Sequence, residues 1–149
     1  PRSQQLAHRC AVSSGDLDEA ERRLHFIEKQ SITINSDALM LHAWRLGEAG
    51  QPDRGRVLLD RITPAAAEEL RHRSLKVWLA VEAGQLQSAV EMAGEGRLAG
   101  AHRAHLARAL HEAGQHRLAE EQMRRACTEI PAVQLKTCQA ALILMKENP

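Results

Sequence analysis

The four-residue sequence Glu-Ala-Gly-Gln occurs three times in this 149-residue chain, at residues 48–51, 82–85 and 112–115. A looser version, Ser-Ser-Gly-Asp, occurs at residues 13–16. The glycines of the four copies are separated by 35, 34 and 30 residues. A chain that repeats itself at a nearly constant period predicts an array of similar units, each packed against the next.

Each of the four glycines ends one helical pattern and comes directly before another. Glycine adopts the left-handed conformation that closes a helix, because it has no Cβ to clash with the backbone. Helix start signals follow: Asp16 can cap with Glu19 three residues later, and Pro52 suits a first helical position. Small residues stand five positions after the glycines and let paired helices approach closely: Ala20, Gly55, Ala89 and Ala119. The repeated unit is therefore predicted to be a helical hairpin.

The composition also favours helices, because the apolar residues are mainly 24 alanines and 19 leucines. Aromatic residues are few: two tryptophans, one phenylalanine and no tyrosine. Thr63 and Pro64 are predicted to start the fifth helix, with Glu68 and Glu69 near its positive end. We predict helices at residues 3–13, 16–30, 36–49, 52–62, 64–83, 86–94, 99–113, 116–129 and 132–146.

The pattern resembles the tetratricopeptide repeat family, whose copies carry small or apolar residues near positions 8 and 11, Gly at 15, Ala at 20 and Pro near 32. The fourth copy fits best, at Leu106, Ala107, Ala109, Leu110, Gly114, Ala119, Ala126 and Pro131. The second copy matches at Ala43, Leu46, Gly50, Leu59 and Ile62, and the third at Val77, Ala80, Gly84 and Ala89. The chain departs from the family in lacking its early Trp and usual Tyr, and Pro64 comes early.

The resemblance implies an all-α fold, a right-handed α-solenoid of stacked antiparallel helix hairpins. The third copy is about four residues short, and we expect its second helix to break off near Gly94 and Gly96. Counting 34 residues from Gly114 reaches Asn148, which we expect to close a fifth repeat in the left-handed conformation. A single domain over residues 1–149 would then contain repeats at about 1–34, 35–68, 69–98 and 99–131, and a half-repeat at 132–149.

Trp44 and Trp78 stand six residues before Gly50 and Gly84. In the tetratricopeptide family this position lies on the concave face, so the resemblance implies an apolar strip that holds a peptide. The alternative is that both rings fill gaps between alanine-rich helices. The predicted partner-binding groove consists of Met40, Trp44, Glu48, Arg71, Trp78, Glu82, Arg108 and His111. A two-carboxylate clamp for an acidic chaperone tail is not expected, since Gln5, Arg9 and Trp44 replace its Lys and Asn residues.

Two other groups of residues are candidate sites. His102 and His105, with His111 and His116 after them, have spacings that a metal accommodates, but solvated helix histidines are favoured and no metal site is predicted. The histidines at positions 25, 42 and 72 are scattered along the chain. Cys127 and Cys138 flank the Ile130-Pro131 turn, where a disulfide or two buried free thiols are open, and we favour the thiols.

Charge and motifs exclude several classes of function. The net charge is +1, and basic and acidic residues are evenly mixed along the chain, so no nucleic-acid partner is expected. No apolar run is long enough for direct membrane insertion. The glycine-rich stretch at residues 94–100 has no strand before it, and no nucleophile elbow or phosphate loop occurs, so neither a catalytic residue nor a cofactor is predicted. The chain is not expected to be an enzyme.

We therefore expect a protein–protein interaction scaffold that binds a peptide or helix of a partner protein, in a bacterial secretion or exopolysaccharide-export assembly. The alternative is a regulatory or oligomerisation module of a larger enzyme or transcription regulator, and a third hypothesis is a small-molecule sensor. The apolar residues 140–145 suggest a longer parent chain or self-association through the 132–147 helix. A cytoplasmic and a periplasmic location both stay open.

Overall fold

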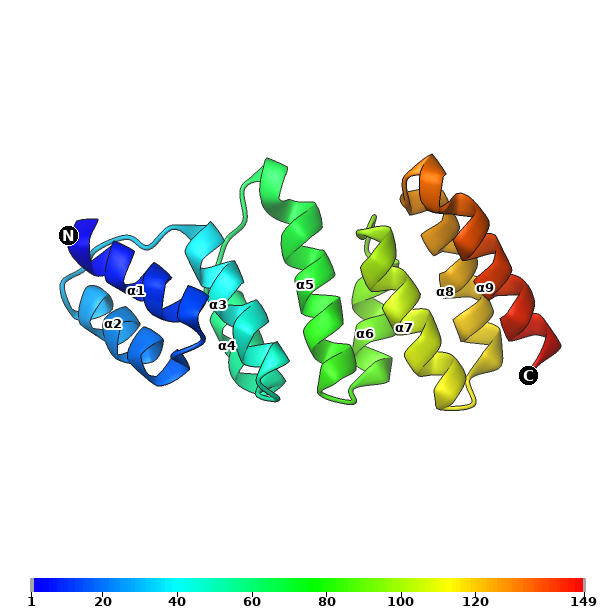
Figure 1. The fold of residues 1–149 in the computed structure, drawn as a ribbon, viewed down its shortest axis with the longest axis horizontal. Coiled ribbons are helices and arrows are strands. Elements are labelled where there is room, and N and C mark those ends of the chain that lie inside the picture. Colours follow the sequence, from blue (N-terminus) through cyan, green and yellow to red (C-terminus); the bar gives the residue numbers. More distant parts are fainter. Residues whose placement is uncertain (1, 149) are drawn as a thin grey trace. The chain divides into compact units, whose positions relative to one another are not determined.

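The computed structural model describes residues 2–148, and within that range all regular structure is helical. The α-helices are α1 (Arg2–Ser14), α2 (Leu17–Lys29), α3 (Ser36–Glu48), α4 (Pro52–Asp60), α5 (Glu69–Glu82), α6 (Leu86–Gly94), α7 (Gly100–Glu112), α8 (His116–Glu129) and α9 (Leu135–Glu147) (Figure 1). Short 3-10 turns, η1 (Ala66–Glu68) and η2 (Ala132–Gln134), precede α5 and α9. The all-α fold class predicted from the repeats and composition is confirmed.

The four repeated glycines all close a helix in the left-handed conformation, as predicted. Gly15, Gly50, Gly84 and Gly114 have φ angles of 80°, 76°, 72° and 78°. In each turn the glycine N–H donates three residues back, and the next N–H donates five residues back; Gln85, for example, donates to the Ala80 carbonyl at 2.9 Å. This paired scheme satisfies carbonyls that the helix end would otherwise leave unbonded. The four hairpins are therefore closed by one shared device.

The start of each following helix is also specified by sequence. The Glu19 N–H donates to the Asp16 side chain at 3.0 Å, which confirms the predicted cap of α2. Pro52 is the first residue of α4, as expected. The small residues five positions after the glycines are all buried: Ala20, Gly55, Ala89 and Ala119. A larger side chain at these positions would hold the paired helices apart.

The chain divides into two compact units, residues 1–64 and 65–149, which we call unit 1 and unit 2. In unit 1, α1 pairs with α2 and α3 pairs with α4 (Figure 1). Fully buried side chains from all four helices form its interior, among them Val12, Ile27, Met40 and Leu59. Unit 1 therefore consists of two complete hairpins.

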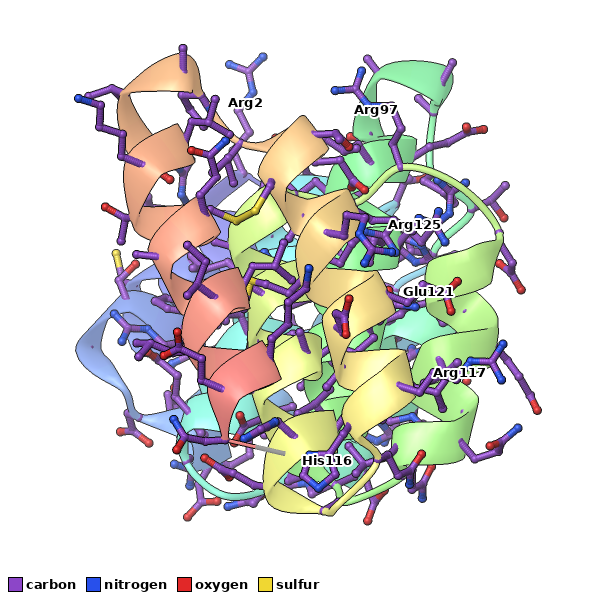
Figure 2. All side chains as sticks on the ribbon, turned by 90° about the vertical axis from the view of Figure 1, so that its right-hand side faces the viewer. Arg2, Arg97, His116, Arg117, Glu121 and Arg125 are labelled. Carbon is purple, nitrogen blue, oxygen red and sulfur yellow. A yellow bond between two sulfur atoms is a disulfide. The ribbon has the colours of Figure 1, made fainter. Side chains whose placement is uncertain are left out.

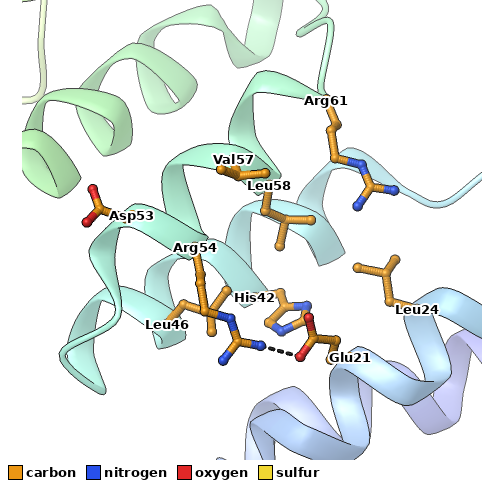
Figure 3. Close-up of a pocket in the computed structure, with 9 residues that line it drawn as sticks. All are labelled: Glu21, Leu24, His42, Leu46, Asp53, Arg54, Val57, Leu58 and Arg61. Atoms are coloured by element: carbon orange, nitrogen blue, oxygen red, sulfur yellow. Dashed lines mark hydrogen bonds and ion pairs between the residues drawn. The ribbon is translucent and has the colours of Figure 1, made fainter.

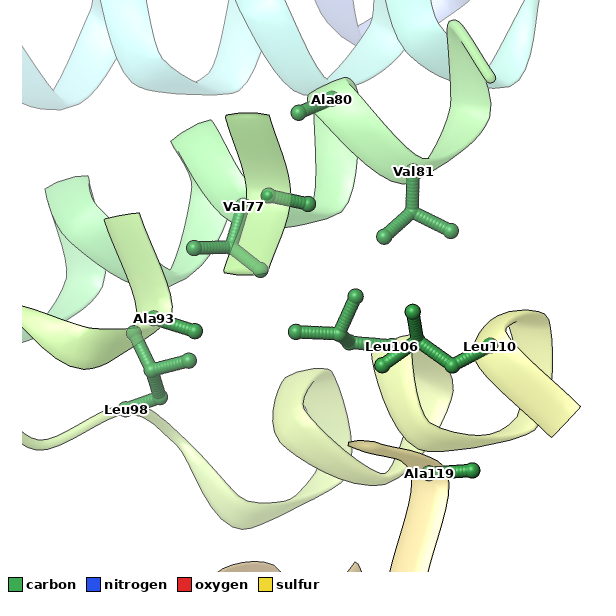
Figure 4. Packing of buried hydrophobic residues seen from close by; sticks show 9 residues of the cluster. Val77, Ala80, Val81, Ala93, Leu98, Leu106, Leu110 and Ala119 are labelled. Carbon is green, nitrogen blue, oxygen red and sulfur yellow. The ribbon is translucent and has the colours of Figure 1, made fainter. Parts of the chain in front are cut away.

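Unit 2 contains the hairpins α5–α6 and α7–α8, with α9 packed on α8. Its main core joins α5, α6, α7 and the start of α8 (Figure 4). The members of this core are Val77, Ala80, Val81, Ala89, Ala93, Leu98, Leu106, Leu110 and Ala119. A second cluster, with Met123 and Cys138 at its centre, fixes α9 to α7 and α8. The start of α5 and the conformation of Asn148 differ from the prediction.

The fifth helix does not begin at Thr63 and Pro64, as the sequence suggested. Ala65 is extended, with φ −67° and ψ 159°, and helical structure starts at Ala66. The Glu68 carboxylate accepts the Ala65 N–H at 3.0 Å, while the Glu68 N–H donates to the Ala65 carbonyl at 2.8 Å. Glu68 thus bonds back to Ala65 at the start of this helical segment, and Pro64 lies before it.

Asn148 does not adopt the predicted left-handed conformation, because its φ is −122°. Its backbone N–H and its side-chain amide both donate to the Leu144 carbonyl, at 3.1 and 3.3 Å. The side chain supplies a bond to the helix end that the four glycine turns obtain from the following backbone N–H. The end of α9 is therefore unlike the other four turns.

The shortened third copy is organised around Arg103, which is fully buried in α7. Its guanidinium donates to the carbonyls of Ala93 and Gly96 at 3.0 and 2.9 Å, and to Gln122 Oε1 at 2.8 Å. Arg103 Nε lies 2.6 Å from a Glu129 oxygen, and the other Glu129 oxygen accepts the Leu98 N–H at 2.6 Å. Burial lowers the pKa of Arg103, and the Glu129 carboxylate opposes this shift. One buried ion pair therefore holds the connection between α6 and α7.

Candidate functional site

The predicted groove residues of unit 1 lie on α3. Trp44 is 36% exposed, and the Arg45 guanidinium lies 5.1 Å from the centre of its ring. Arg45 Nη1 also donates to Glu48 at 3.1 Å, so the two exposed groove residues share one cationic neighbour. Met40 is fully buried in the interior of unit 1 and has no surface for a partner. Unit 1 thus presents Trp44 and Glu48, but not Met40.

The predicted groove residues of unit 2 lie on α5 and α7, two helices that pack against each other. Trp78 is partly buried, whereas Glu82 one turn later is exposed, as are Arg71 and Arg108. Glu82 is bridged to α7 by His105 Nε2 at 2.8 Å. In this unit the predicted groove residues therefore lie on two helices that pack against each other.

The histidines weighed as metal ligands form pairs and no larger cluster. His111 and His116 face each other across the α7–α8 turn, with their Nδ1 atoms 3.2 Å apart. His105 is bonded to Glu82 instead, and burial lowers the pKa of His102. In the part of the chain that the structure describes, no group of three or more His, Cys, Asp or Glu residues is arranged to hold a metal ion.

Cys127 on α8 and Cys138 on α9 form a disulfide, with their Cα atoms 5.6 Å apart (Figure 2). The favoured interpretation of two free thiols was therefore wrong. The antiparallel packing of α8 and α9 about the Pro131 turn brings the two side chains within bonding distance. Spacing alone could not decide this point, because the 3-10 turn η2 shifts the register at which α9 begins.

Unit 1 contains a pocket of about 280 Å³ that the sequence analysis missed, between α2 and the α3–α4 hairpin (Figure 3). Its lining residues are Glu21, Leu24, His42, Leu46, Asp53, Arg54, Val57, Leu58 and Arg61. The leucines and His42 are buried and form its inner wall, whereas Val57 is 65% exposed and lies at the opening. We call this cavity the His42 pocket.

His42 is paired with a second buried histidine, His8 on α1. His8 Nε2 and His42 Nδ1 are 3.1 Å apart, and the rings meet edge to face. Burial lowers the pKa of both rings, that of His42 to about 4, with the positive form of the His8 ring as a smaller cause. Both rings are therefore neutral at pH 7. The two residues are 34 positions apart, so the repeat period itself was the signal that could have placed them side by side.

Helix α9 and the short turn before it carry exposed apolar side chains. Ile143 and Leu144 are exposed on α9, and Val133 is exposed in the 3-10 turn before it. This agrees with the apolar character noted for residues 140–145. Among residues 2–148, none of the helices combines the length and apolar character needed to cross a bilayer.

Comparison with known proteins found no relative of this chain. No family model, no curated protein and no solved structure matches the chain.

Proposed function

We propose that the chain forms a tetratricopeptide-like right-handed solenoid that acts as a protein–protein interaction scaffold. The observation that carries the proposal is the repeated hairpin: four glycines near a 34-residue period, each in the left-handed conformation and each with the same two hydrogen bonds. Units of this kind bury their apolar faces only against neighbours, so they stack in sequence. Stacked hairpins present their first helices along one side, where a peptide or helix of a partner binds.

The side chains proposed as anchors on the first helices support this function. Trp44 and Trp78 occupy equivalent positions in consecutive copies, and large aromatic side chains dominate the binding energy of many interfaces. Arg71 is exposed on α5, the helix that carries Trp78, and Arg108 is exposed on the adjacent helix α7. Arginine side chains suit bidentate pairing with carboxylates of a partner. The proposed ligand is therefore a peptide with apolar side chains and at least one acidic residue.

A bacterial secretion or exopolysaccharide-export assembly is the setting we propose for this scaffold. The Cys127–Cys138 disulfide supports it, because such bonds persist in oxidising compartments. The alternative function is a regulatory or oligomerisation module of a larger protein. The exposed apolar residues of α9 favour that alternative, since a sister domain or a second copy would cover them.

Selection of binding peptides from a random library, with the purified chain as bait, tests the scaffold function. Trp44→Ala combined with Trp78→Ala should lower the affinity for the selected peptides at least tenfold in calorimetric titrations, because both proposed anchors are lost. Far-ultraviolet circular dichroism should stay nearly unchanged. Phe26→Ala is the matched control, since Phe26 is an aromatic residue that is 43% exposed on α2, outside the proposed groove.

Two results would contradict this assignment. If Phe26→Ala lowers the affinity for the peptides by the same factor, the assignment of the groove to the first helices is contradicted. A loss of helicity in the double tryptophan variant would show that both rings belong to the packed interior, and the binding role would be withdrawn.

A further inference from the structure

Helix α9 buries little of its own surface against the rest of unit 2. Among its residues, all of which lie in the described part of the chain, only Cys138 is buried, whereas six residues of α7 are buried. Ala141, Leu142 and Met145 are partly buried against the same cluster. Cys138 Sγ lies 3.8 Å from Met123 Sδ, at the centre of that cluster. The packing of α9 and its covalent bond to α8 therefore depend on the same side chain.

The polar contact between α9 and α8 adds little to this packing. Lys146 Nζ lies 3.6 Å from a Glu120 oxygen, and both side chains are partly exposed. Glu120 is also paired with Arg124 on its own helix. Exposed ion pairs contribute little to stability, because water screens the charges and both side chains lose conformational freedom. The α6–α7 connection is held differently, by the buried pair of Arg103 and Glu129.

The helical structure of α9 also depends on its neighbours. The helix has 13 residues, and an isolated helix of that length is marginal in water. Its N-cap residue, Gln134, forms no side-chain cap hydrogen bond. A released α9 would therefore lose its helical structure, and the conformational entropy gained by the chain favours release.

We propose that the Cys127–Cys138 disulfide is a redox switch for α9. Reduction by a dithiol lets α9 leave α8 and unfold, while the hairpins α5–α6 and α7–α8 stay folded. A bond across a sequence separation of 11 residues changes the ratio of docked to released α9 by about 100-fold. This inference goes beyond the proposed scaffold function and does not depend on it, because none of the proposed groove residues lies on α9.

The reduction proceeds by two exchange steps, the first at Cys127. Cys127 is partly exposed and Cys138 is buried, so the attacking thiolate reaches Cys127 Sγ. A bond forms between the reductant sulfur and Cys127 Sγ, the bond to Cys138 breaks, and Cys138 Sγ leaves with the electron pair and takes up a proton. The second thiolate of the reductant then displaces Cys127 Sγ, which also takes up a proton. The two cysteines gain two electrons, and the dithiol is oxidised to its own disulfide.

Release of α9 changes the surface of unit 2. Ala104 and Ala107 on α7 and Met123 and Ala126 on α8 are buried in one cluster with Cys138. The departure of α9 removes part of the cover from these four side chains. The disulfide therefore controls the exposure of an apolar surface on α7 and α8.

Amide hydrogen exchange of the intact chain, resolved by residue in NMR spectra, tests the switch. The amides of residues 139–147 report α9, and those of the second half of α7 report the folded hairpins. With excess dithiothreitol, the α9 amides should lose about 100-fold of the protection that they have in the disulfide form. The α7 amides of the same reduced sample should stay at least about 100-fold better protected than those of α9, because the hairpins open separately and more rarely.

Two variants separate the disulfide from other effects of the reductant. Cys127→Ala removes the bond permanently, so its α9 amides should be as weakly protected as in the reduced chain, with no further change on addition of dithiothreitol. Cys10→Ser is the matched control, because Cys10 is exposed and unpaired on α1. This control should keep the full response to the reductant. The α7 amides report in every sample whether unit 2 is folded.

Three outcomes would overturn the proposal. Equal protection of the α9 and α7 amides in the reduced chain would show that unit 2 opens as one body, so that the disulfide only stabilises it. Protection of α9 that reduction leaves unchanged would show that packing alone keeps the helix in place. A loss of α9 protection in Cys127→Ala that occurs only on addition of dithiothreitol would assign the effect to another group.

Discussion

The two units bury polar groups in opposite ways. Unit 1 buries His8 and His42, which are kept neutral by their surroundings. Unit 2 buries Arg103 and Glu129 as an ion pair that also bonds to backbone groups and to Gln122. A neutral pair costs little desolvation but fails when it must take up a proton, whereas an ion pair is costly to desolvate and fails when either partner is removed. The two units should therefore respond to different perturbations.

The tryptophans allow this comparison to be made in one molecule. Trp44 is in unit 1 and Trp78 is in unit 2, and they are the only tryptophans in the chain. Trp78→Phe leaves a fluorescence signal that reports unit 1, and Trp44→Phe leaves one that reports unit 2. Denaturant unfolding of each single-tryptophan background then gives a free energy of unfolding for its own unit.

The largest effect is expected from Arg103→Met in unit 2. The change leaves the Glu129 carboxylate buried without its cation, which should lower the free energy of unfolding by about 3 to 5 kcal/mol. The Trp78 signal should show the loss, because the contacts of Arg103 all lie in unit 2. The control is Arg103→Met combined with Glu129→Gln, which removes the stranded charge and should recover part of the loss. Equal stability of the single and double variants would argue against a buried charge pair.

Acid should affect unit 1 through its histidine pair. The pKa of His42 is about 4 in the folded chain, well below its ordinary value of 6.5, so the unfolded chain binds the proton more tightly. The stability from this residue is complete above pH 6.5 and should fall by about 3 kcal/mol as the pH drops to 4. His8 adds to the fall in the same direction. Unfolding of unit 1 measured from pH 7 to pH 4 should show it.

His42→Leu should flatten this pH dependence, whereas His25→Gln should leave it intact because His25 is exposed on α2. The neutral-pair interpretation fails if the Trp44 signal shows the same pH dependence in both variants.

Reduction of the Cys127–Cys138 disulfide should destabilise unit 2 by a similar or slightly smaller amount. The bond closes a loop across a sequence separation of 11 residues, which corresponds to about 2.8 kcal/mol of restricted unfolded-chain entropy. Cys138→Ser should lower the stability reported by Trp78, and a reductant should have the same effect on the unaltered chain. Cys10→Ser is the control, since Cys10 is exposed and unpaired. An unchanged unfolding midpoint in Cys138→Ser would contradict a stabilising bond.

The smallest effect should come from the shared turns, where the two units ought to behave alike. Gly50→Ala and Gly84→Ala each place a Cβ on a residue with positive φ and should cost about 1 to 2 kcal/mol in their own units. Neither Cβ meets another atom within 4 Å, so the cost is one of backbone conformation alone. Gly94→Ala is the matched control: it ends α6 with equally open space and no positive φ, and it should be neutral or stabilising. A cost in only one unit would show that the four turns are not equivalent.

The hairpins were predictable from sequence because their signals are local. A glycine in the left-handed conformation and a cap such as Asp16 act on backbone groups within five residues, so spacing alone identifies them. The start of α5 was predicted wrongly because the prediction relied on Thr63 and Pro64, whereas the bond from the Ala65 N–H to the Glu68 carboxylate marks the start of the helical segment. Local rules cannot rank such competing caps.

The buried polar groups were not predictable in the same way. In the sequence, Arg103 cannot be distinguished from an arginine on the surface. Only the folded α6–α7 connection places the carbonyls of Ala93 and Gly96 where Arg103 bonds to them. The sequence predicts Met40 as a groove residue, and only the packing of unit 1 shows that it is fully buried. His42 could have been found from its 34-residue separation from His8, but its pocket depends on the placement of three helices.

The bonds between Arg103 and the α6–α7 connection limit how this part of the chain can vary. Inserting the roughly four residues that would restore the full repeat length would move the acceptor carbonyl of Gly96 and the Leu98 N–H away from the pair. Gly100 adds a second restraint, because a Cβ there would come within 2.1 Å of an Ile130 methyl carbon. A longer connection is therefore compatible with this packing only if the arginine and its carboxylate are replaced together, so insertion length and the identity of both residues should change as a set among related chains.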